Sequence, residues 1–375
     1  ELASANGTFV ALAWDGARER LWLAADSLGG RPLYFAQRGE TLFFSTLLEV
    51  LLRIPVLRPR FDFGAFIEQE AFCYPLSDLT LYQGIRVLRD SEFLCWTSAG
   101  MKRARYFEWS RIELRQLSLD EAADDGAAAF TAAVRDRAPR TGAAAKALLS
   151  GGLDSRCINA VLHQMGVRIQ PATLRIPSSQ DYEYAKRFAS LLGIELLESP
   201  YRLDLPRLTT GQTTRAALSA AVRPLAPGRV FSGDGGGETF GLLLLSPAVT
   251  SLLAQGKRDA AIQAYLDGHR IPARIFRRSL RSVALRRPAE ALRKALDEYP
   301  HLPAEKAMHL FVILEDLRRH LHDFFEIAPR LGLDLVLPFY DRRVLLSVLR
   351  LAPPLEGFLE HRLYGAILRR MPEIC

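Results

Sequence analysis

The first part of the chain consists of short apolar runs separated by turn signals such as Asp15-Gly16 and Gly29-Gly30. This pattern is typical of antiparallel β-structure. We predict strands at residues 8–14, 21–25, 33–36, 42–45, 85–87 and 92–96. A short helix is expected over 47–52, and residues 106–109 close the region. The sequence therefore predicts a β-rich domain over residues 1–108, followed by a linker.

The pattern then changes to alternating strands and helices. A long helix is predicted from Ser118 to Asp136, because its apolar positions recur at helical spacing. Strands are predicted at 143–149, 168–176, 195–197 and 229–231, and helices at 155–165 and 181–192. The first of these strands is apolar except for Lys146, as expected for a strand that is buried on both faces. This alternation predicts a parallel sheet covered by helices, and from about Ser251 onward the chain is expected to be largely helical.

The composition excludes a disordered chain and favours ordinary folded domains. The chain has 375 residues, of which 49% are hydrophobic and 24% charged, which corresponds to two or three domains. The longest apolar stretch, at 241–254, is too short to cross a bilayer and is interrupted by Ser246-Pro247. We therefore expect no membrane segment.

The cysteines do not form a disulfide or metal framework. They are scattered, without a CxxC pair or a histidine at ligand spacing: Cys73, Cys95, Cys157 and Cys375. We interpret them as free thiols in a reducing cytoplasm. No signal peptide is visible, and the chain begins at Glu1 without a methionine, so we expect that both ends could be cut.

The net charge of +7 is concentrated in one stretch, residues 270–294. Its basic residues are Arg270, Arg274, Arg277, Arg278, Arg281, Arg286, Arg287, Arg293 and Lys294. Such a stretch can bind a polyanion such as RNA. The alternative that we favour is a solvated helix face, with Leu280, Val283, Ala284 and Leu285 packing on the other side. We do not expect a nucleic-acid partner.

The most informative motif follows the strand at 143–149. It reads Ser150, Gly151, Gly152, Leu153, Asp154 and Ser155, and it leads into a helix. Adjacent glycines let phosphate oxygens approach the backbone amides, and a helix start directs further N–H groups at the same point. Asp154 alone would repel phosphates, so a bridging Mg²⁺ explains its presence. A plain capped turn is the alternative, and the combination of six residues in this context argues against it.

The loop lacks the Gly-Lys-Ser/Thr end of a Walker motif. Ser-Gly-Gly-x-Asp-Ser resembles instead the signature of the ATP pyrophosphatases, which cleave ATP between the α and β phosphates. A second glycine-rich loop, residues 232–241, follows the strand at 229–231 and includes Asp234 and Glu238. Carboxylates among glycines suit metal-phosphate binding or the polarisation of an incoming amine.

Taken in order, these segments resemble the asparagine synthetase family, including its β-lactam synthetase and lasso-peptide cyclase relatives. Residues 26–34 and 42–45 resemble the second half of the family's glutaminase domain, and 338–341 resemble its "PFLD" segment. The resemblance implies an α/β protein in which a partial, Ntn-hydrolase-like β-rich domain precedes a parallel-sheet ATP-pyrophosphatase (HUP-like) domain. This second domain would span residues 118–375 and have a helical C-terminal part.

The resemblance also implies roles for individual residues. Residues 150–155 would hold the ATP phosphates, with Asp154 on Mg²⁺, and Ser232 and Gly233 would lie beside the nucleotide. Asp234 would interact with the adenylated intermediate and with the nucleophile. Arg362 or His361 would supply the cation that a late lysine supplies in the family. The implied reaction first forms an acyl-AMP from a small-molecule or peptide carboxylate, and an amine then displaces AMP.

Several departures point away from housekeeping asparagine synthesis towards a specialised relative. The family's N-terminal cysteine nucleophile would lie upstream of Glu1, Gly237 replaces a common acidic residue, and Arg156 replaces a second serine. Glutamine would supply ammonia if the longer protein carries that cysteine, and otherwise the amine would belong to the substrate, as in ring-closing relatives. A tRNA-modifying ATP pyrophosphatase and a non-enzymatic relative remain alternatives. A homodimer is a candidate assembly.

Overall fold

The computed structural model describes residues 2–140, 142–200, 220–267 and 276–373. The chain forms two compact units, each built from separate stretches of the sequence. Unit 1 comprises Glu1–Arg115, Leu244–His322 and Ala352–Glu356. Unit 2 comprises Gln116–Leu243, Asp323–Leu351 and Gly357–Cys375. This division differs from the one based on sequence, because residues 244–322 group with the β-rich segment.

Unit 1 contains antiparallel sheets. One sheet has the order β1-β2-β8-β9, with strands Val10–Asp15, Arg20–Ala25, Glu92–Thr97 and Gly100–Arg105. A second has the order β4-β3-β7, with strands Thr41–Ser45, Tyr34–Arg38 and Arg86–Val87, and β5 (Arg60–Phe61) pairs with β6 (Tyr82–Gln83). In the first sheet Leu23 pairs with Leu12 and Leu94, and Leu23 and Leu94 are fully buried.

The strands that the sequence predicts in this region are confirmed as β1, β2, β3, β4, β7 and β8, with small shifts at their ends. The predicted short helix is confirmed as α1 (Leu48–Leu52). Among the described strands and α-helices of this region, β5, β6, β9 and α2 (Phe63–Phe72) were not predicted. The Asp62 side chain begins α2 by accepting a hydrogen bond from the Ala65 amide at 3.0 Å.

The remaining helices of unit 1 lie late in the sequence. They are α8 (Pro247–Ala254), α9 (Arg258–Asp267), α10 (Arg278–Leu296) and α11 (Ala304–Phe311). A π-helical segment, Val312–Leu317, connects α11 to α12 (Arg318–Ile327), and the boundary between the units falls within α12. The predicted helical character after Ser251 is therefore confirmed.

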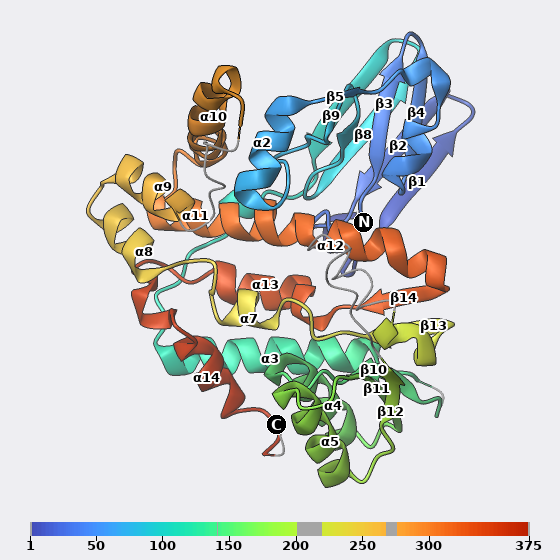
Figure 1. Ribbon diagram of the computed structural model, residues 1–375, viewed down its shortest axis with the longest axis vertical. Coiled ribbons are helices and arrows are strands. Elements are labelled where there is room, and N and C mark those ends of the chain that lie inside the picture. The colour runs from blue at the N-terminus through green and yellow to red at the C-terminus, as the bar shows by residue number, and fades with distance from the viewer. Residues whose placement is uncertain (1, 141, 201–219, 268–275, 374–375) are drawn as a thin grey trace. The chain divides into compact units, whose positions relative to one another are not determined.

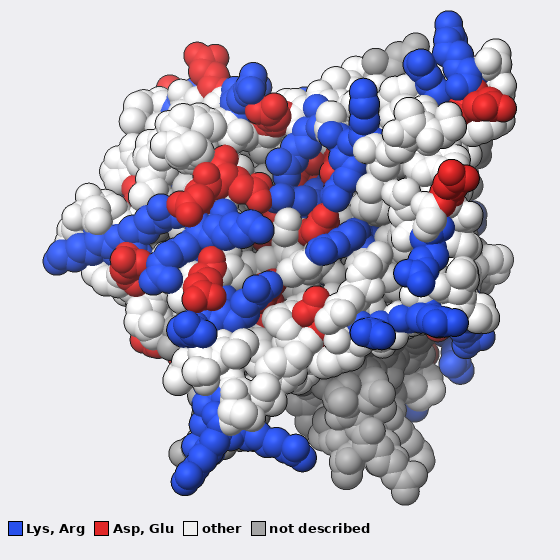
Figure 2. Space-filling view, turned by 90° about the horizontal axis from the view of Figure 1, so that it is seen from above, with Lys and Arg blue, Asp and Glu red and all other residues white. Residues whose placement is uncertain are grey.

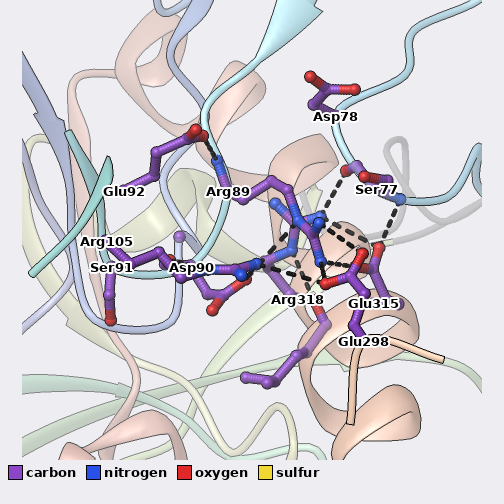
Figure 3. Close-up of polar contacts among 12 residues, drawn as sticks. Ser77, Asp78, Arg89, Asp90, Ser91, Glu92, Arg105, Glu298, Glu315 and Arg318 are labelled. Carbon is purple, nitrogen blue, oxygen red and sulfur yellow. Dashed lines mark hydrogen bonds and ion pairs between the residues drawn. The ribbon is translucent and has the colours of Figure 1, made fainter. Parts of the chain in front are cut away.

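An ion-pair network around the largely buried Arg89, Glu315 and Arg318 holds the segment after β7 to these helices within unit 1 (Figure 3). Arg89 contacts Glu298 at 2.8 Å and Glu315 at 2.7 Å, and Glu315 also pairs with the fully buried Arg318 at 3.4 Å. Burial acts to raise the pKa of Glu315, but the charges of Arg89 and Arg318 outweigh it and lower the pKa. Paired charges of this kind avoid the cost of leaving an isolated ion in the interior.

The described part of the arginine-rich stretch lies mainly on α10, whereas Arg270 and Arg274 fall outside the described residues. Its ion pairs include Arg287 with Glu68 at 2.6 Å and Arg293 with Asp259 at 2.8 Å. Figure 2 shows basic and acidic side chains intermingled on one face of the molecule. The fully buried residues of α10 are Pro288, Leu292 and Leu296. Of the predicted packing residues, Leu280, Val283 and Ala284 are partly buried and Leu285 is exposed, so the predicted packing face is confirmed except at Leu285.

Unit 2 contains a five-stranded parallel sheet in the order β12-β11-β10-β13-β14 (Figure 1). Its strands are Leu197–Pro200, Ile169–Arg175, Ala145–Leu148, Gly228–Phe231 and Leu333–Val336. Besides the second half of α12, its described α-helices are α3 (Leu119–Arg137), α4 (Leu153–Gln164), α5 (Gln180–Leu192), α7 (Gly236–Phe240), α13 (Arg342–Leu349) and α14 (Arg362–Leu368). The predicted α/β class and parallel sheet are confirmed.

The direction in which the sheet grows reverses at β10. Strands β11 and β12 follow β10 on one side, whereas β13 and β14 extend the sheet on the other. In parallel sheets of this kind, ligands bind outside the carboxyl ends of the strands at such a switch point. The predicted strand at 195–197 lies two to three residues too early, because β12 starts at Leu197.

Aromatic packing fixes the helices around the sheet of unit 2. Phe130 of α3 stacks on Phe339 with ring centroids 4.5 Å apart, and Phe240 of α7 contacts both rings. Ser118 and Glu121 form a capping box at the start of α3, which confirms the predicted beginning of this helix. In the part of the chain that the structure describes, no helix has both the length and the apolar character needed to span a bilayer.

Candidate active site

The Ser150–Ser155 loop lies at the carboxyl end of β10 and folds back on itself. The Ser150 and Ser155 hydroxyls are 3.1 Å apart, Ser155 donates to the Gly152 carbonyl at 3.0 Å, and the Gly152 amide donates to Ser150 at 3.3 Å. No side chain caps the start of α4 at Gly152. The first amides of this helix therefore have no capping side chain, and the adjacent Leu153 is half-exposed.

Glycines are required where this loop meets its neighbours. Gly151 has a φ of +93°, and a Cβ there would overlap the carbonyl oxygen of Asp181 at the start of α5. A Cβ on Gly233 would lie 2.6 Å from the Ser155 amide nitrogen, and a Cβ on Gly236 would lie 2.5 Å from the Asp154 carboxyl carbon. The two glycine-rich loops therefore lie against each other at the ends of the neighbouring strands β10 and β13.

The Asp154 carboxylate is held between the second loop and α14. Tyr364 donates a short hydrogen bond to Oδ1, and the Gly237 amide donates to Oδ2 at 3.3 Å. Burial raises the pKa of Asp154, and these two hydrogen bonds act in the opposite direction. The negative charge of Asp234 also raises this pKa, and the nearby His361 lowers it.

The second predicted carboxylate, Asp234, lies in the loop after β13. Tyr340 donates to its Oδ2 at 3.1 Å, and its own amide donates to the Ser232 hydroxyl at 3.4 Å. Gly235 has a φ of +90°, and a Cβ there would lie 2.5 Å from the Tyr340 ring. The structure thus brings Asp154, Asp234, Ser232 and their loops together.

The contacts of Asp341, in the segment 338–341, indicate a role in holding the fold together. Its side chain begins α13 by accepting a hydrogen bond from the Arg343 amide at 2.8 Å, and it pairs with Arg137 at 2.5 Å and with the Arg343 guanidinium at 2.9 Å. Burial opposes ionisation, but the hydrogen bonds and charges of Arg343 and Arg137 lower the pKa of Asp341 to about 2. This aspartate therefore ties α3 to α13.

Arg362 is the first residue of α14 and is exposed to solvent. Among the described residues, it forms no hydrogen bond or ion pair with the two glycine-rich loops. His361, at the preceding position, lies nearer: its Nδ1 would be 3.1 Å from a Cβ added at Gly241. Both side chains thus lie at the start of α14, two or three residues before Tyr364.

The sequence analysis assigned no role to Tyr340, which lies in the segment 338–341, or to Tyr364, which lies two residues after Arg362. Their partners are 106 and 210 residues away in the sequence, so no local pattern indicates the contacts. Gly237 was noted only as a departure, yet its amide is one of the two donors to Asp154. The one available signal was a tyrosine where the "PFLD" segment has leucine.

The donor set suits Mg²⁺ bound together with phosphates. Within the described residues, no group of three or more His, Cys, Asp or Glu side chains could hold a metal by itself. Mg²⁺ commonly takes one or two carboxylates and completes its shell with water and substrate phosphates. One carboxylate, Asp154, beside a glycine-lined loop and a helix start fits that mode.

Comparison with known proteins agrees with this geometry. Residues 126–371 match the asparagine synthase family, and residues 1–107 match the glutamine amidotransferase domain family. The chain belongs to the asparagine synthase family. The predicted resemblance is confirmed, and the family's two parts occur here in the expected order.

A relative within the family is asparagine synthetase (glutamine-hydrolyzing) 3 of Bacillus subtilis (strain 168). It is 28% identical to this chain over 158 residues, which cover 42% of this chain and 25% of the relative. The match thus spans about a quarter of the relative's length.

Proposed function

We propose that the chain carries the ligase centre of an ATP-dependent amide ligase of the asparagine synthetase type. It would adenylate a carboxylate, release pyrophosphate, and transfer the acyl group to an amine. The observation that carries this proposal is the meeting of two glycine-rich loops, which contain Asp154 and Asp234, at the switch point of the parallel sheet. Membership of the asparagine synthase family supports it.

In the first step, the amides and hydroxyls of the Ser150–Ser155 loop would bind the ATP phosphates. Ser232 and Gly233 would lie beside the nucleotide, and Asp154 would hold Mg²⁺. When bound, Mg²⁺ neutralises charge on the phosphates. The substrate carboxylate attacks the α phosphorus, the bond to the β phosphate oxygen breaks, and pyrophosphate leaves. Arg362 or His361 would stabilise the charge of the departing pyrophosphate.

In the second step, the amine attacks the carbonyl carbon of the acyl-AMP, and AMP leaves with the electrons of the broken C–O bond. The amine must lose a proton as the amide forms. Asp234 would orient the amine and accept that proton, because a carboxylate held at this loop can act as a general base. The Tyr340 hydroxyl, 3.1 Å from Oδ2, would keep the other oxygen directed at the substrate.

We also propose which classes of carboxylate and amine the ligase uses. The carboxylate would be a small molecule or a peptide side chain. Glutamine would be the nitrogen source if the longer protein hydrolyses it, as the name of the Bacillus relative states for that enzyme. A substrate amine would replace it in a ring-closing ligase. Tests with free ammonium and with tethered amines distinguish the two.

The test is the exchange of labelled pyrophosphate into ATP in the presence of a panel of carboxylates. We expect exchange with the wild type for at least one carboxylate, because adenylation is reversible before the amine arrives. Asp154→Ala should reduce the exchange rate at least about a hundredfold, since the variant loses the carboxylate beside the phosphates. Circular dichroism should show that the variant remains folded.

Exchange at the wild-type rate in folded Asp154→Ala would refute the role of Asp154. Pyrophosphate release that requires tRNA, and not a carboxylate and an amine, would instead refute the ligase function. Failure of the wild type to bind ATP with Mg²⁺ in calorimetry would indicate a non-enzymatic relative.

A further inference from the structure

We propose that Tyr364 is a positioning residue that fixes the metal-binding carboxylate of Asp154. The inference rests on the proposed function, which assigns Asp154 to Mg²⁺. It adds that α14 contributes to metal affinity through one hydroxyl group, without contacting the metal. Three observations in unit 2 support it: the contacts of the carboxylate, the packing of the tyrosine, and the space around Asp154.

The first observation is that the two carboxylate oxygens have different donors. Tyr364 donates to Oδ1 and the Gly237 amide donates to Oδ2 at 3.3 Å. One donor on each oxygen fixes the plane of the carboxylate about its χ2 angle. Each carboxylate oxygen has a second lone pair, so both oxygens remain able to bind a cation.

The second observation is that Tyr364 itself has little freedom. The side chain is buried, its ring lies 6.0 Å from the fully buried Phe240 ring, and its hydroxyl also contacts the Cys157 thiol. Phe240 in turn packs against Phe130 and Phe339. Because the ring is fixed by its neighbours, the hydroxyl can hold Asp154 without losing further conformational freedom.

The third observation is the closeness of the second loop to Asp154. The Gly236 backbone leaves no room for a side chain, because a Cβ would lie 2.5 Å from the carboxyl carbon. The second loop therefore packs against one side of the Asp154 carboxylate. The Tyr364 hydroxyl, on α14, holds the carboxylate from another side. Between them, the carboxylate has one orientation and not several.

Two effects of the hydroxyl on metal binding oppose each other. The hydrogen bond withdraws negative charge from Oδ1, which weakens attraction to a cation. It also removes the rotational freedom that metal binding would otherwise have to remove. Partners that orient metal ligands typically contribute about 10–100-fold to metal affinity, so we expect orientation to dominate. Removing the hydroxyl should therefore weaken metal binding.

The experiment measures Mn²⁺ affinity in the presence of α,β-methylene-ATP, with free Mn²⁺ followed by electron paramagnetic resonance. Tyr364→Phe keeps the ring and removes only the hydroxyl. We expect its Kd for Mn²⁺ to rise about tenfold, whereas nucleotide affinity without metal stays unchanged. Tyr340→Phe is the matched control: it removes a hydroxyl that binds Asp234, and its Kd for Mn²⁺ should stay within about twofold.

An unchanged or lower Kd for Mn²⁺ in Tyr364→Phe would overturn the proposal. An equal rise in both phenylalanine variants would also overturn it, because the effect would then not depend on the Asp154 contact. Unfolding of Tyr364→Phe would assign the hydroxyl to the stability of the fold instead. Wild-type binding no tighter than that of Asp154→Ala would refute the proposed function itself, and this outcome is distinct from the others.

Discussion

At the scale of single residues, the carboxylates of unit 2 differ in the groups that surround them. Asp341 pairs with two guanidinium groups, whereas Asp154 receives hydrogen bonds from a hydroxyl and an amide. A hydroxyl or an amide orients a carboxylate without cancelling its charge. Burial raises the pKa of Asp154 despite its two hydrogen bonds, whereas the contacts with Arg343 and Arg137 lower the pKa of Asp341 despite its burial. The environment of Asp341 suits a structural role, and that of Asp154 suits the binding of a cation.

The stabilising role of Asp341 leads to a prediction about pH. Its folded-state pKa of about 2 is below its ordinary value, so its stabilising effect is present above pH ~4 and is lost as the pH falls through 2. Asp341→Asn should lower the free energy of unfolding by about 2 kcal/mol at pH 7. The difference from the wild type should shrink as the pH falls from about 4 towards 2, as measured by urea denaturation.

Asp136→Asn provides the control for this measurement. Asp136 pairs with the same Arg343 at 2.8 Å, but its side chain is 56% exposed. Exposed ion pairs contribute about 0–1 kcal/mol, so this variant should lose little stability. Equal losses in the two variants would show that the burial of Asp341 is not the source of its effect.

At the scale of elements, the site depends on close approaches between a loop and the helix or loop beside it. The Ser150–Ser155 loop meets the start of α5 at Gly151 and the second loop at Gly233 and Gly236. At each of these glycines, atoms of the neighbouring element occupy the space that a side chain would need. The precision of the site therefore comes from the packing of elements that the parallel sheet brings together.

Adjacent glycines of this loop should differ in their tolerance of alanine. Gly151→Ala places a side chain at φ +93° and against the Asp181 carbonyl, so we expect a loss of about 1–3 kcal/mol in the free energy of unfolding. Gly152 has an ordinary φ of −66°, and the nearest atom to an added Cβ is the Ser150 hydroxyl at 3.5 Å. Gly152→Ala should change stability by less than about 1 kcal/mol in the same urea titrations. Equal tolerance of both substitutions would contradict the described contact with α5.

The elements that the sequence predicted are those with a strong local pattern. Apolar runs bounded by glycine identified β2, β3, β10 and β13, and the long apolar repeat identified α3. Strand β9 was missed because it lies at the edge of its sheet and contains Lys102, Arg103 and Arg105. A charged sequence of this kind is also typical of a loop. The loop Ser150–Ser155 was visible because six consecutive residues form it. The hydrogen bonds of Asp154 and Asp234 were not visible, since tertiary packing alone brings their tyrosines near.

At the scale of the whole chain, the compact units do not follow the linear order of the sequence. Residues 244–322 belong with 1–115, although the asparagine synthase match extends over 126–371. The ion pairs of Arg89 with Glu298 and with the buried Glu315 support this grouping. Without these helices, the interior of the β-rich segment would contain charges whose partners lie elsewhere in the sequence.

This interdependence predicts how a fragment of the chain behaves. Residues 1–115 expressed alone would lack Glu298 and Glu315, so Arg89 would have to be hydrated, which opens the core around β7. Removing one partner of a buried ion pair typically costs about 3–5 kcal/mol, a large share of a small domain's stability. We expect the fragment to unfold without a cooperative transition in urea, whereas residues 1–115 joined to 244–322 by a flexible linker should unfold cooperatively. A cooperative transition in the isolated fragment would show that the β-rich segment is an independent domain, and that the ion pairs only dock helices onto a finished fold.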